Sequence, residues 1–495
     1  MTNCSLPSHW AVSTLGEICT IIQGQSPPSN TYNFEGKGLP FLQGKAEFGS
    51  MYPKAVKWCM APKKISEPED VLISVRAPVG PTNLCAVQSC IGRGLAAIRT
   101  HANMLPKFIL YALRASEEEL RSKSTGTTFQ AIRGDDLRTH PIGLPPLAEQ
   151  ERIVAEIEKQ FTRLDAAEAA LRRVEVNLKR YRASVLKAAC EGKLVPTEAE
   201  LAEAEGRDNE HAEQLLESIL AERRAHWESQ EKRRGKYKEP VLPDTPDSPE
   251  LPTGWVWATV DQLILGSPQN GIYKPKSLYG DGIPILRIED YQDFHVRTLD
   301  QLQRLRITAE ETSIYGLAAN HLIINRVNSP SHLGKTLLVP DHFSPAVFES
   351  NMMRVIPSRF VVSPFLAHYL RSPEGRGRLT SNAKWAVNQA SINQSDVCTT
   401  PVPVPPLHEQ HRIIAEVERS LSIIQQLVTA VEASLKRVER LRQSILKQAF
   451  AGQLLPQDPD DEPASLLLER IREERGADHS VTSRSPQLRL QEVKK

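Results

Sequence analysis

The sequence contains one long stretch that occurs twice. Residues 144–196 recur as residues 404–456, and the two copies align without a gap at a constant offset of about 260 residues, with about 20 of roughly 53 positions identical. Chance does not produce a match of this length. The chain is therefore built from two related halves, and its fold has to contain the same element twice.

Apolar residues in each copy repeat every seven positions. The main seam runs through Ile157, Leu164, Leu171, Leu178 and Val185 in the first copy, and through Val417, Ile424, Val431, Val438 and Ile445 in the second. We expect a second seam beside it, formed by Ile153, Ala167, Val174 and Tyr181 in the first copy and by Ile413, Leu427 and Leu441 in the second. Apolar heptads sustained in this way are typical of a coiled-coil helix.

Each copy also carries signals for where its helix begins and ends. The pairs Pro145–Pro146 and Pro405–Pro406 restrict the residue before them to an extended backbone, so each helix should follow an extended segment. Gly192 and Gly452 are the matching stops. We predict two helices of about 40 residues that pair as a coiled coil. A pair of ordinary bundle helices is the alternative.

The regions before the two helices have the texture of mixed, strand-rich domains. Residues 1–140 and 250–400 are rich in Gly and Pro and contain short β-type runs without long heptads. They are weak repeats of each other. The matching stretches are LPSHWAVSTLGEI (6–18) with LPTGWVWATVDQL (251–263), GLPFLQG (38–44) with GIPILRI (282–288), VLISVR (71–76) with HLIINR (321–326), and Ile132–Asp136 with Ile392–Asp396. Between these points the two regions diverge.

A charged segment follows each helix. AEQLLESILAER (212–223) is predicted to form an amphipathic helix, and ASLLLERIREER (464–475) is its counterpart in the second half. The Pro-rich stretch PVLPDTPDSPELP (240–252) reads as an extended linker, and the tail after Gly476 is expected to be disordered.

The order of segments predicts the fold class. We expect an α+β fold in which two mixed, strand-rich globular domains are separated by two long antiparallel coiled-coil helices, with a pseudo-twofold internal repeat. Antiparallel pairing is expected because it alone places the domains at opposite ends of the paired helices. The predicted segments are a first domain (1–143), a helix (144–196), a charged helical segment and linker (197–249), a second domain (250–403), a helix (404–456), and a short helix with a tail (457–495).

Composition sets only broad limits. The net charge is +1, so a partner nucleic acid would need other subunits to supply much of the positive field. No apolar run approaches the roughly 18 residues that span a bilayer, and the N-terminus lacks the pattern of a signal peptide. The seven cysteines are odd in number and form no C-x-x-C pair, so we expect neither a disulfide framework nor a metal site, and a cytoplasmic location.

Several chemical motifs are present only in part. Phe34–Gly38 matches the F-x-G-x-G of a methyltransferase cofactor loop, but no N-P-P-[YFW] follows, which favours a surface turn. Gly334–Thr336 resembles the end of a phosphate-binding loop, but Ser329 stands where its first glycine must turn. Asp135–Asp136 is interpreted as a turn or cap, and Glu117–Glu119 as a solvated helix face, rather than as a nuclease carboxylate cluster. No catalytic constellation remains, and the chain is predicted not to be an enzyme by itself.

The duplicated helix points to a family. Its LPPLAEQERI and VPPLHEQHRI openings, its heptads, and its KAACEGKLVP and KQAFAGQLLP endings resemble the specificity subunit of type I restriction-modification enzymes. The resemblance covers nearly the whole chain. It implies that each globular domain is a target recognition domain that reads one half of an asymmetric bipartite DNA site, while the helices set the spacing between the halves.

The resemblance also implies partners for the chain. Double-stranded DNA is expected, together with two modification (methyltransferase) subunits on the paired helices and restriction (endonuclease and translocase) subunits outside them, and no membrane. S-adenosylmethionine would belong to the modification subunits, and ATP and Mg to the restriction subunits, while this chain binds no cofactor. The source would be bacterial or archaeal. About 40 helical residues give roughly 60 Å, enough for half-sites about one turn of DNA apart.

Candidate base-reading residues follow short apolar runs, where loops would present polar side chains to base edges. They are Gln43, Lys45 and Arg76 in the first domain and Arg287, Arg326 and Lys335 in the second. A basic stretch with Arg371, Arg376, Arg378 and Lys384 could contact phosphates. Surface charges with no DNA contact are the alternative for each.

Two other functions share part of this pattern. A structural coiled-coil scaffold would have the heptads, but it would not need two diverged domains on a common framework. A fused restriction-methyltransferase would need the N-P-P-Y motif and a nuclease site, which the sequence lacks.

Overall fold

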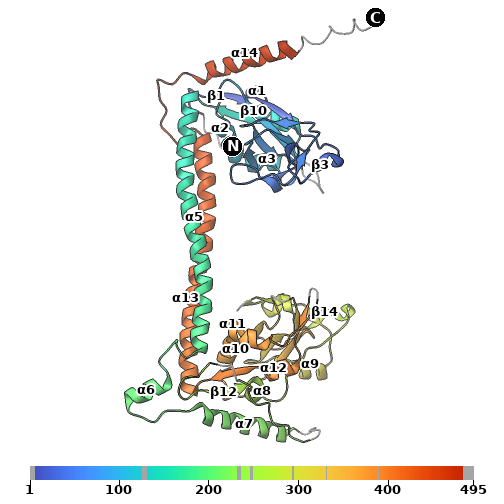
Figure 1. Ribbon diagram of the computed structural model, residues 1–495, viewed down its shortest axis with the longest axis vertical. Helices are drawn as coiled ribbons and strands as arrows, with labels where there is room; N and C mark the ends of the chain where they lie inside the picture. Colours follow the sequence, from blue (N-terminus) through green and yellow to red (C-terminus); the bar gives the residue numbers. More distant parts are fainter. Residues whose placement is uncertain are drawn as a thin grey trace. The chain divides into compact units, whose positions relative to one another are not determined.

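The computed structural model describes residues 6–124, 131–230, 236–245, 249–292, 295–329, 332–386 and 389–482. The chain forms two compact units, residues 1–172 with 432–495 and residues 173–431. Each unit therefore contains one globular domain and a part of each long helix. The colours of Figure 1 show that each unit combines segments from distant parts of the sequence.

The two duplicated stretches form the two longest helices among the described residues. α5 spans Leu147–Cys190 and α13 spans Leu407–Phe450, and each has 44 residues. A strand precedes each of them, β11 (Pro141–Leu144) and β25 (Pro401–Val404), because the Pro-Pro pair keeps the approach extended. Gly192 and Gly452 end the helices in the left-handed region, with φ of 66° and 69°.

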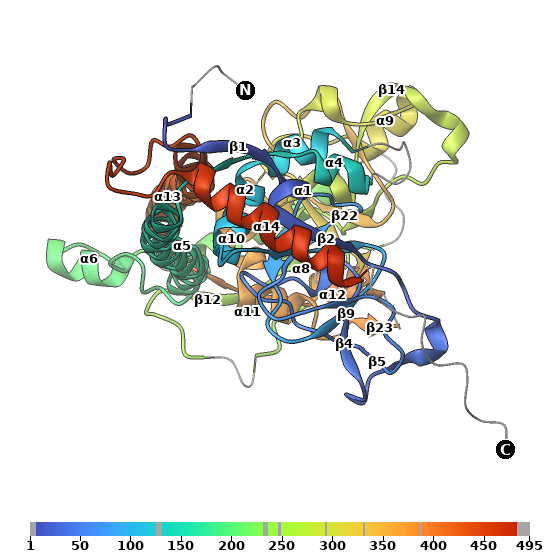
Figure 2. The ribbon, with the colours of Figure 1, turned by 90° about the horizontal axis from the view of Figure 1, so that it is seen from above.

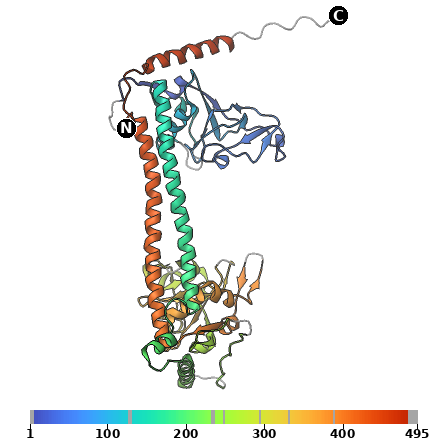
Figure 3. The ribbon, with the colours of Figure 1, turned by 60° about the vertical axis from the view of Figure 1, so that its left-hand side comes forward.

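The two helices pack together and run antiparallel in each unit (Figures 1 and 3). In the first unit, Ile157 near the start of α5 shares a core with Ile445 near the end of α13. Arg442 of α13 pairs there with Glu168 of α5 at 3.0 Å. In the second unit, Val185 near the end of α5 shares a core with Val417 near the start of α13. The predicted fold class is confirmed.

The main seam lies inside the helix pair. Eight of its ten residues are buried, while Leu164 and Leu171 are half-buried. The predicted second seam is wrong along most of its length, since Val174, Tyr181, Leu427 and Leu441 are 41–53% exposed. Only Ile153 and Ile413 are buried, within the cores that the globular domains contribute to.

The second seam instead lies four residues after each main-seam position. It consists of Phe161, Glu168, Glu175, Arg182 and Ala189 in α5, and of Leu421, Val428, Leu435, Arg442 and Ala449 in α13, all of them buried or half-buried. Charged residues occupy four of these positions, so a search for apolar heptads misses them. Long charged side chains can lay their aliphatic stems along a seam while their charged groups reach water.

Within its described residues, the first domain contains three sheets. In the first sheet, β1 (Ala11–Thr14) pairs with β11. The second sheet has the strand order β2 (Cys19–Gln23), β10 (Leu95–Thr100), β7 (Val71–Ser74) and β8 (Thr82–Leu84). The third has the order β3 (Tyr32–Asn33), β5 (Trp58–Cys59), β4 (Leu39–Leu42), β9 (Ser89–Ile91) and β6 (Ile65–Ser66). Its helices are α1 (Leu15–Ile18), α2 (Pro106–Ala115), α3 (Glu117–Ser122) and α4 (Gly134–Arg138). Phe108 and Tyr111 of α2 share one core with the sheet that contains β7 and with the ends of the long helices.

The second domain repeats this arrangement and adds to it. β12 (Val256–Thr259) pairs with β25, and a four-stranded sheet has the order β13 (Gln269–Asn270), β22 (Met352–Val355), β18 (Leu322–Asn325) and β20 (Thr336–Leu338). A three-stranded sheet has the order β17 (Arg304–Leu305), β14 (Tyr279–Leu286) and β21 (Val347–Phe348). The remaining strands are β15 (Tyr291–Gln292) paired with β16 (His295–Val296), and a sheet of β19 (Val327–Asn328), β24 (Ala390–Ser391) and β23 (Lys384–Trp385). Its helices are α8 (Val260–Leu263), α9 (Ala309–Tyr315), α10 (Ser363–Arg371), α11 (Pro373–Leu379) and α12 (Gln394–Cys398).

Strand register tests the repeats that the sequence indicated. Phe41 pairs with Cys90 in parallel, as Ile285 does with Val347, so the GLPFLQG and GIPILRI stretches correspond as predicted. The predicted alignment of the VLISVR stretch with the HLIINR stretch is wrong by one residue. Val75 N–H donates to Gly94 O as Arg326 N–H donates to Asn351 O, which makes Arg326 the counterpart of Val75. A single-residue shift reverses the face to which a strand side chain points.

A buried tryptophan joins each domain to both long helices. In the first unit, Trp10 Nε1 donates to Glu149 of α5 at 2.9 Å, and Gln457 Nε2 donates to the other oxygen of that carboxylate at 2.8 Å. In the second unit, Trp255 Nε1 donates to Glu409 of α13 at 3.0 Å. A Cβ at Gly452 would lie 2.3 Å from Pro7, so only glycine lets the end of α13 approach this closely.

The charged segments after the long helices pack on the nearby domain. α14 (Ala464–Thr482) lies across α1 (Figure 2), where Arg475 donates to Glu17 O at 2.6 Å. α6 (Glu198–Glu205) and α7 (Ala212–Ser229) follow α5, and Arg223 of α7 pairs with Asp261 at 2.8 Å. The helix continues past Gly476, so the predicted start of the tail is too early. Residues 483–495 lie outside the described residues.

Two further findings concern the whole set of described residues. None of the helices in them is long and apolar enough to cross a membrane. The six cysteines that the structure covers, Cys19, Cys59, Cys85, Cys90, Cys190 and Cys398, are unpaired, and Cys4 lies outside those residues.

The role of the joint in the second unit can be tested by mutation of Glu409. Glu409 accepts from Trp255 Nε1 and from Glu198 N, and burial raises the pKa of this carboxyl. Glu409→Gln keeps one acceptor but turns an NH₂ group toward a donor. We expect it to destabilise the joint by about 1–3 kcal/mol and to speed amide exchange at Glu198, measured by hydrogen-deuterium exchange. Glu418→Gln, on the exposed face of the same helix, is the control. The same rate of amide exchange at Glu198 in both variants would contradict the role of the joint.

Candidate nucleic-acid interface

Three loops meet at one edge of the first domain. The loop at residues 43–45 follows β4, the loop at 74–77 follows β7, and the loop at 92–94 joins β9 to β10. Backbone hydrogen bonds hold them together: Gly92 N donates to Leu42 O at 2.8 Å, and Val75 N donates to Gly94 O at 2.9 Å. The sheet framework therefore fixes the positions of loops that come from distant parts of the sequence.

Glycine allows the loops to come this close. A Cβ at Gly94 would lie 2.3 Å from Gln43 O, and a Cβ at Gly24 would lie 2.2 Å from Gly92 O. Both distances are well inside van der Waals contact, so a larger residue at either position would push the loops apart.

Polar side chains gather around the cavity between these loops. Its volume is about 260 Å³, and Ser26, Gln43, Lys45, Arg76 and Arg93 are among the residues that line it. The last four are exposed, and their side chains make no hydrogen bond or ion pair with any residue that the structure describes. A small pocket with an amide and three cations is suited to base-edge acceptors and phosphate oxygens.

The structure brings together the three candidates that the sequence indicated in the first domain. Gln43, Lys45 and Arg76 all line this one cavity. Arg93 was missed, because it stands between two glycines in a turn rather than after an apolar run. The signal that could have found it is Gly92-Arg93-Gly94 itself, a lone cation in a tight turn that joins two strands.

The second domain has a corresponding set of loops with different side chains. Arg287 follows β14 where Gln43 follows β4, and Glu349 stands where the first domain has Gly92, because Glu349 N donates to Leu286 O as Gly92 N does to Leu42 O. Arg287 pairs with Glu289 at 2.9 Å, and its Nε lies 3.5 Å from Glu349. Here the cation is surrounded by carboxylates.

Backbone pairing also identifies an aromatic residue that the sequence analysis missed. Gly271 N donates to Met352 O as Gly24 N does to Leu95 O, so Tyr273 occupies the position of Ser26. The Tyr273 side chain is 81% exposed. A large exposed aromatic residue at this position favours stacking or apolar contact with a base.

The other candidates in the second domain are less exposed. Arg326 is half-buried and donates to Ser350 O at 3.1 Å, as expected of the counterpart of buried Val75. Lys335 Nζ lies over the ring of buried Tyr291, 5.5 Å from its centre. These two residues contact their own domain in this structure.

The basic stretch in the second domain contains residues that bond to their own domain and one residue that is exposed. Arg371 Nε donates to Thr336 O at 2.8 Å, which ties α10 to β20, and Arg376 Nε donates to Leu333 O at 2.9 Å, which ties α11 to the turn before β20. Arg378 pairs with Glu374 at 3.1 Å. Lys384 is exposed on β23, beside exposed Trp385. No group of three or more His, Cys, Asp or Glu residues that could hold a metal ion occurs among the described residues.

Comparison with known proteins agrees with this architecture. Residues 7–175 match the family model described as the type I restriction modification DNA specificity domain. The chain is 25% identical over 501 residues to the type I restriction enzyme StySPI specificity subunit of Salmonella potsdam, covering 96% of this chain and 97% of that protein. It is 45% identical over 156 residues to the putative type I restriction enzyme MjaX specificity subunit of Methanocaldococcus jannaschii, which covers 31% of this chain and 37% of that protein.

A solved structure shares the fold. It comes from work on complex assembly and conformational transition of the type I R-M system, and it matches with a TM-score of 0.58 and 22% identity over 91% of this chain and 100% of that one. The chain is therefore similar to specificity subunits of type I restriction enzymes over 96% of its length, and residues 7–175 match the DNA specificity domain of that family.

The role of the loop cavity in the first domain can be tested by mutation of Arg76 and Arg93. Arg76→Ala and Arg93→Ala should each weaken binding of the target duplex by about 5- to 100-fold if the arginine contacts a base. If it contacts a phosphate, the slope of affinity against salt concentration should fall by about one. Fluorescence anisotropy of the assembled complex on its target duplex measures both.

A matched control is Arg121→Ala, since Arg121 is exposed on α3 and does not line the cavity. Parent-like affinity and salt dependence in both Arg76→Ala and Arg93→Ala would contradict a DNA contact at this cavity.

Proposed function

We propose that this chain is the sequence-specific DNA-binding subunit of a type I restriction-modification complex. Each globular domain reads one half of an asymmetric bipartite site, and the paired helices set the distance between the halves. The observation that carries the proposal is the repeated framework with unlike loop chemistry: Gln43, Arg76 and Arg93 in one domain, and Tyr273, Arg287 and Glu349 in the other.

The unlike loops imply unlike half-sites. An arginine can donate two hydrogen bonds to guanine, glutamine can pair with adenine, and glutamate can accept from the amino group of cytosine. The first domain offers an amide and cations without carboxylate neighbours among the cavity-lining residues, whereas Arg287 of the second lies between Glu289 and Glu349. The two domains therefore favour different bases.

We assign the segments of the chain accordingly. Residues 1–143 and 250–403 are the two target recognition domains. Residues 144–196 and 404–456 are the spacer helices, 197–249 is the charged segment with its linker, and 457–495 contains α14 and the tail.

The chain contributes recognition rather than chemistry to the complex. Its relatives are specificity subunits, which fits a non-catalytic role, and the sequence lacks the motifs of a methyltransferase or nuclease. Two modification subunits would bring S-adenosylmethionine and transfer the methyl group. Restriction subunits would bring ATP and Mg and cut the DNA.

The exposed apolar residues of the long helices support docking of the modification subunits there. In the second unit, Val174, Val176 and Tyr181 of α5 and Ile423 and Leu427 of α13 are exposed, and in the first unit Leu441 of α13 is exposed. Large apolar residues on a polar helix pair are typical of a protein interface. A scaffold without DNA recognition would account for this surface, but not for two loop sets on a repeated framework.

Exchange of one domain tests this function and is the third prediction. Replacing residues 1–143 with the first domain of another specificity subunit should change one half-site and leave the other half-site and the gap unchanged. Sequencing of methylated sites in cells that carry the modification subunit gives the readout. The reciprocal exchange of residues 250–403 is the matched control and should change only the other half-site. A change in both halves from one exchange would contradict the assignment of one half-site to each domain.

A further inference from the structure

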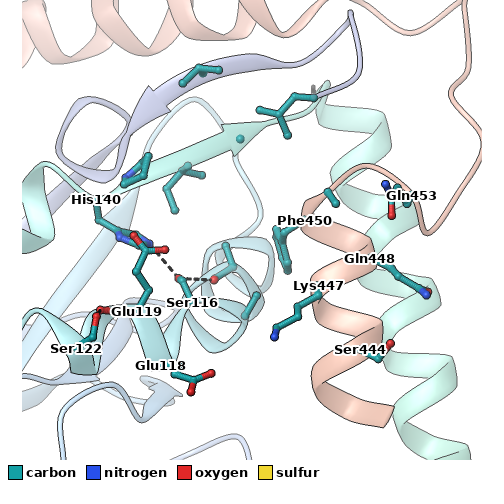
Figure 4. A pocket seen from close by; sticks show the side chains of 18 residues that line it. Ser116, Glu118, Glu119, Ser122, His140, Ser444, Lys447, Gln448, Phe450 and Gln453 are labelled. Carbon is teal, nitrogen blue, oxygen red and sulfur yellow. Dashed lines mark hydrogen bonds between the residues drawn. The ribbon is translucent and has the colours of Figure 1, made fainter. Parts of the chain in front are cut away.

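The first unit contains a large groove away from the loop cavity. Its volume is about 1220 Å³, and it lies between the β1–β11 pair, the α2–α3 corner and the end of α13. Figure 4 shows Glu118 and Glu119 of α3 on one side and Lys447 and Phe450 of α13 on the other. Apolar residues from β1, β11 and α2 complete the lining, among them Val12, Ile142 and Ala115.

The second unit fills the corresponding position with its own side chains. Ala11 pairs with Leu144 as Val256 pairs with Val404, so Trp257 is the counterpart of Val12. The guanidinium of Arg378, on α11, lies over the Trp257 ring at 4.9 Å from its centre. An aromatic ring and a cation therefore occupy this position in one half of the repeat.

In the first unit neither β1 nor α3 supplies such a group, and the ring and cation that line the groove, Phe450 and Lys447, come from α13 instead. Val12 is 73% exposed, and α3 carries Glu118 in the groove wall, whereas α11 of the second unit carries Arg378. The Glu118 carboxylate is exposed and makes no hydrogen bond or ion pair with the residues that the structure describes. The groove thus combines the exposed apolar side chain of Val12 with an unpaired carboxylate on its α3 wall, opposite Lys447 on α13. The apolar residue and the carboxylate are complementary to an aromatic side chain next to a cation.

The groove also continues a surface already assigned to a partner. Leu441 of α13 is exposed, and Ser444, one helical turn further on, lines the groove. A protein bound along the exposed apolar side of α13 would therefore reach the groove without leaving the surface.

We propose that this groove receives a segment of a modification subunit in which an aromatic side chain stands beside an arginine or lysine. The inference rests on the proposed function, because that function supplies the partner. The segment provides in trans what Trp257 and Arg378 provide within the second unit. The two modification subunits then contact the two halves of this chain differently, although the helices on which they dock are repeats.

Filling the groove from within tests the proposal. Val12→Trp supplies the residue that the second unit has in the same strand position, and Glu118→Arg replaces the acid with a cation. Each variant should weaken one of the two binding steps of the purified modification subunit by at least about tenfold and leave the other step unchanged, measured by isothermal titration and native mass spectrometry. Val87→Trp, at another exposed valine of the same domain, is the control.

Glu118→Arg keeps the test decisive if Val12→Trp impairs folding, because Glu118 is exposed on a helix surface. Parent-like binding of both steps in Glu118→Arg and in folded Val12→Trp would overturn the inference and leave the proposed function standing. A parent chain that binds no modification subunit would overturn both.

The occupant is identified by crosslinking. A benzophenone on Ser444→Cys in the assembled complex should crosslink to a modification-subunit peptide with an aromatic residue next to Arg or Lys. Crosslinks only to this chain's residues 1–5 or 125–130, or to a second copy of the chain, would overturn the inference.

Discussion

The structure depends on one buried hydrogen bond that occurs in both halves. Trp10 donates to Glu149 and Trp255 donates to Glu409, and each carboxylate belongs to the first turn of a long helix. Each carboxylate also accepts from the segment that follows the other long helix, through Gln457 or through the Glu198 amide. Because an unpaired buried acceptor is costly, the domain, the start of one helix and the end of the other are held together.

This joint separates the constant part of each unit from the variable part. The sheets, the helix ends and the Trp–Glu pair recur with the same register in both halves. The loops after β4 and β14, and the turns before β10 and β22, carry unlike side chains on that shared frame. A protein that must keep one architecture while changing what it reads needs this division, and the proposed function relies on it.

The sequence predicted the elements that follow a simple period or stop signal. The main seam, the helix ends at Gly192 and Gly452, and the Asp136 cap are local patterns, and the structure contains all of them. The second seam was predicted wrongly because Glu168, Glu175 and Arg182 occupy seam positions with their stems. Arg326 was matched to Arg76 because an apolar run does not fix strand register. Arg93 and Tyr273 reach their sites through backbone pairing between distant segments, which no local pattern reveals.

We propose that the domains read bases and that the helices measure the distance between them. Inserting one heptad into both α5 and α13 keeps the seam in register, and adds at most about 10 Å, or roughly three base pairs. Sequencing of methylated sites should then show the same specified bases with a gap wider by up to about three positions. A fixed gap with altered specified bases would contradict the account.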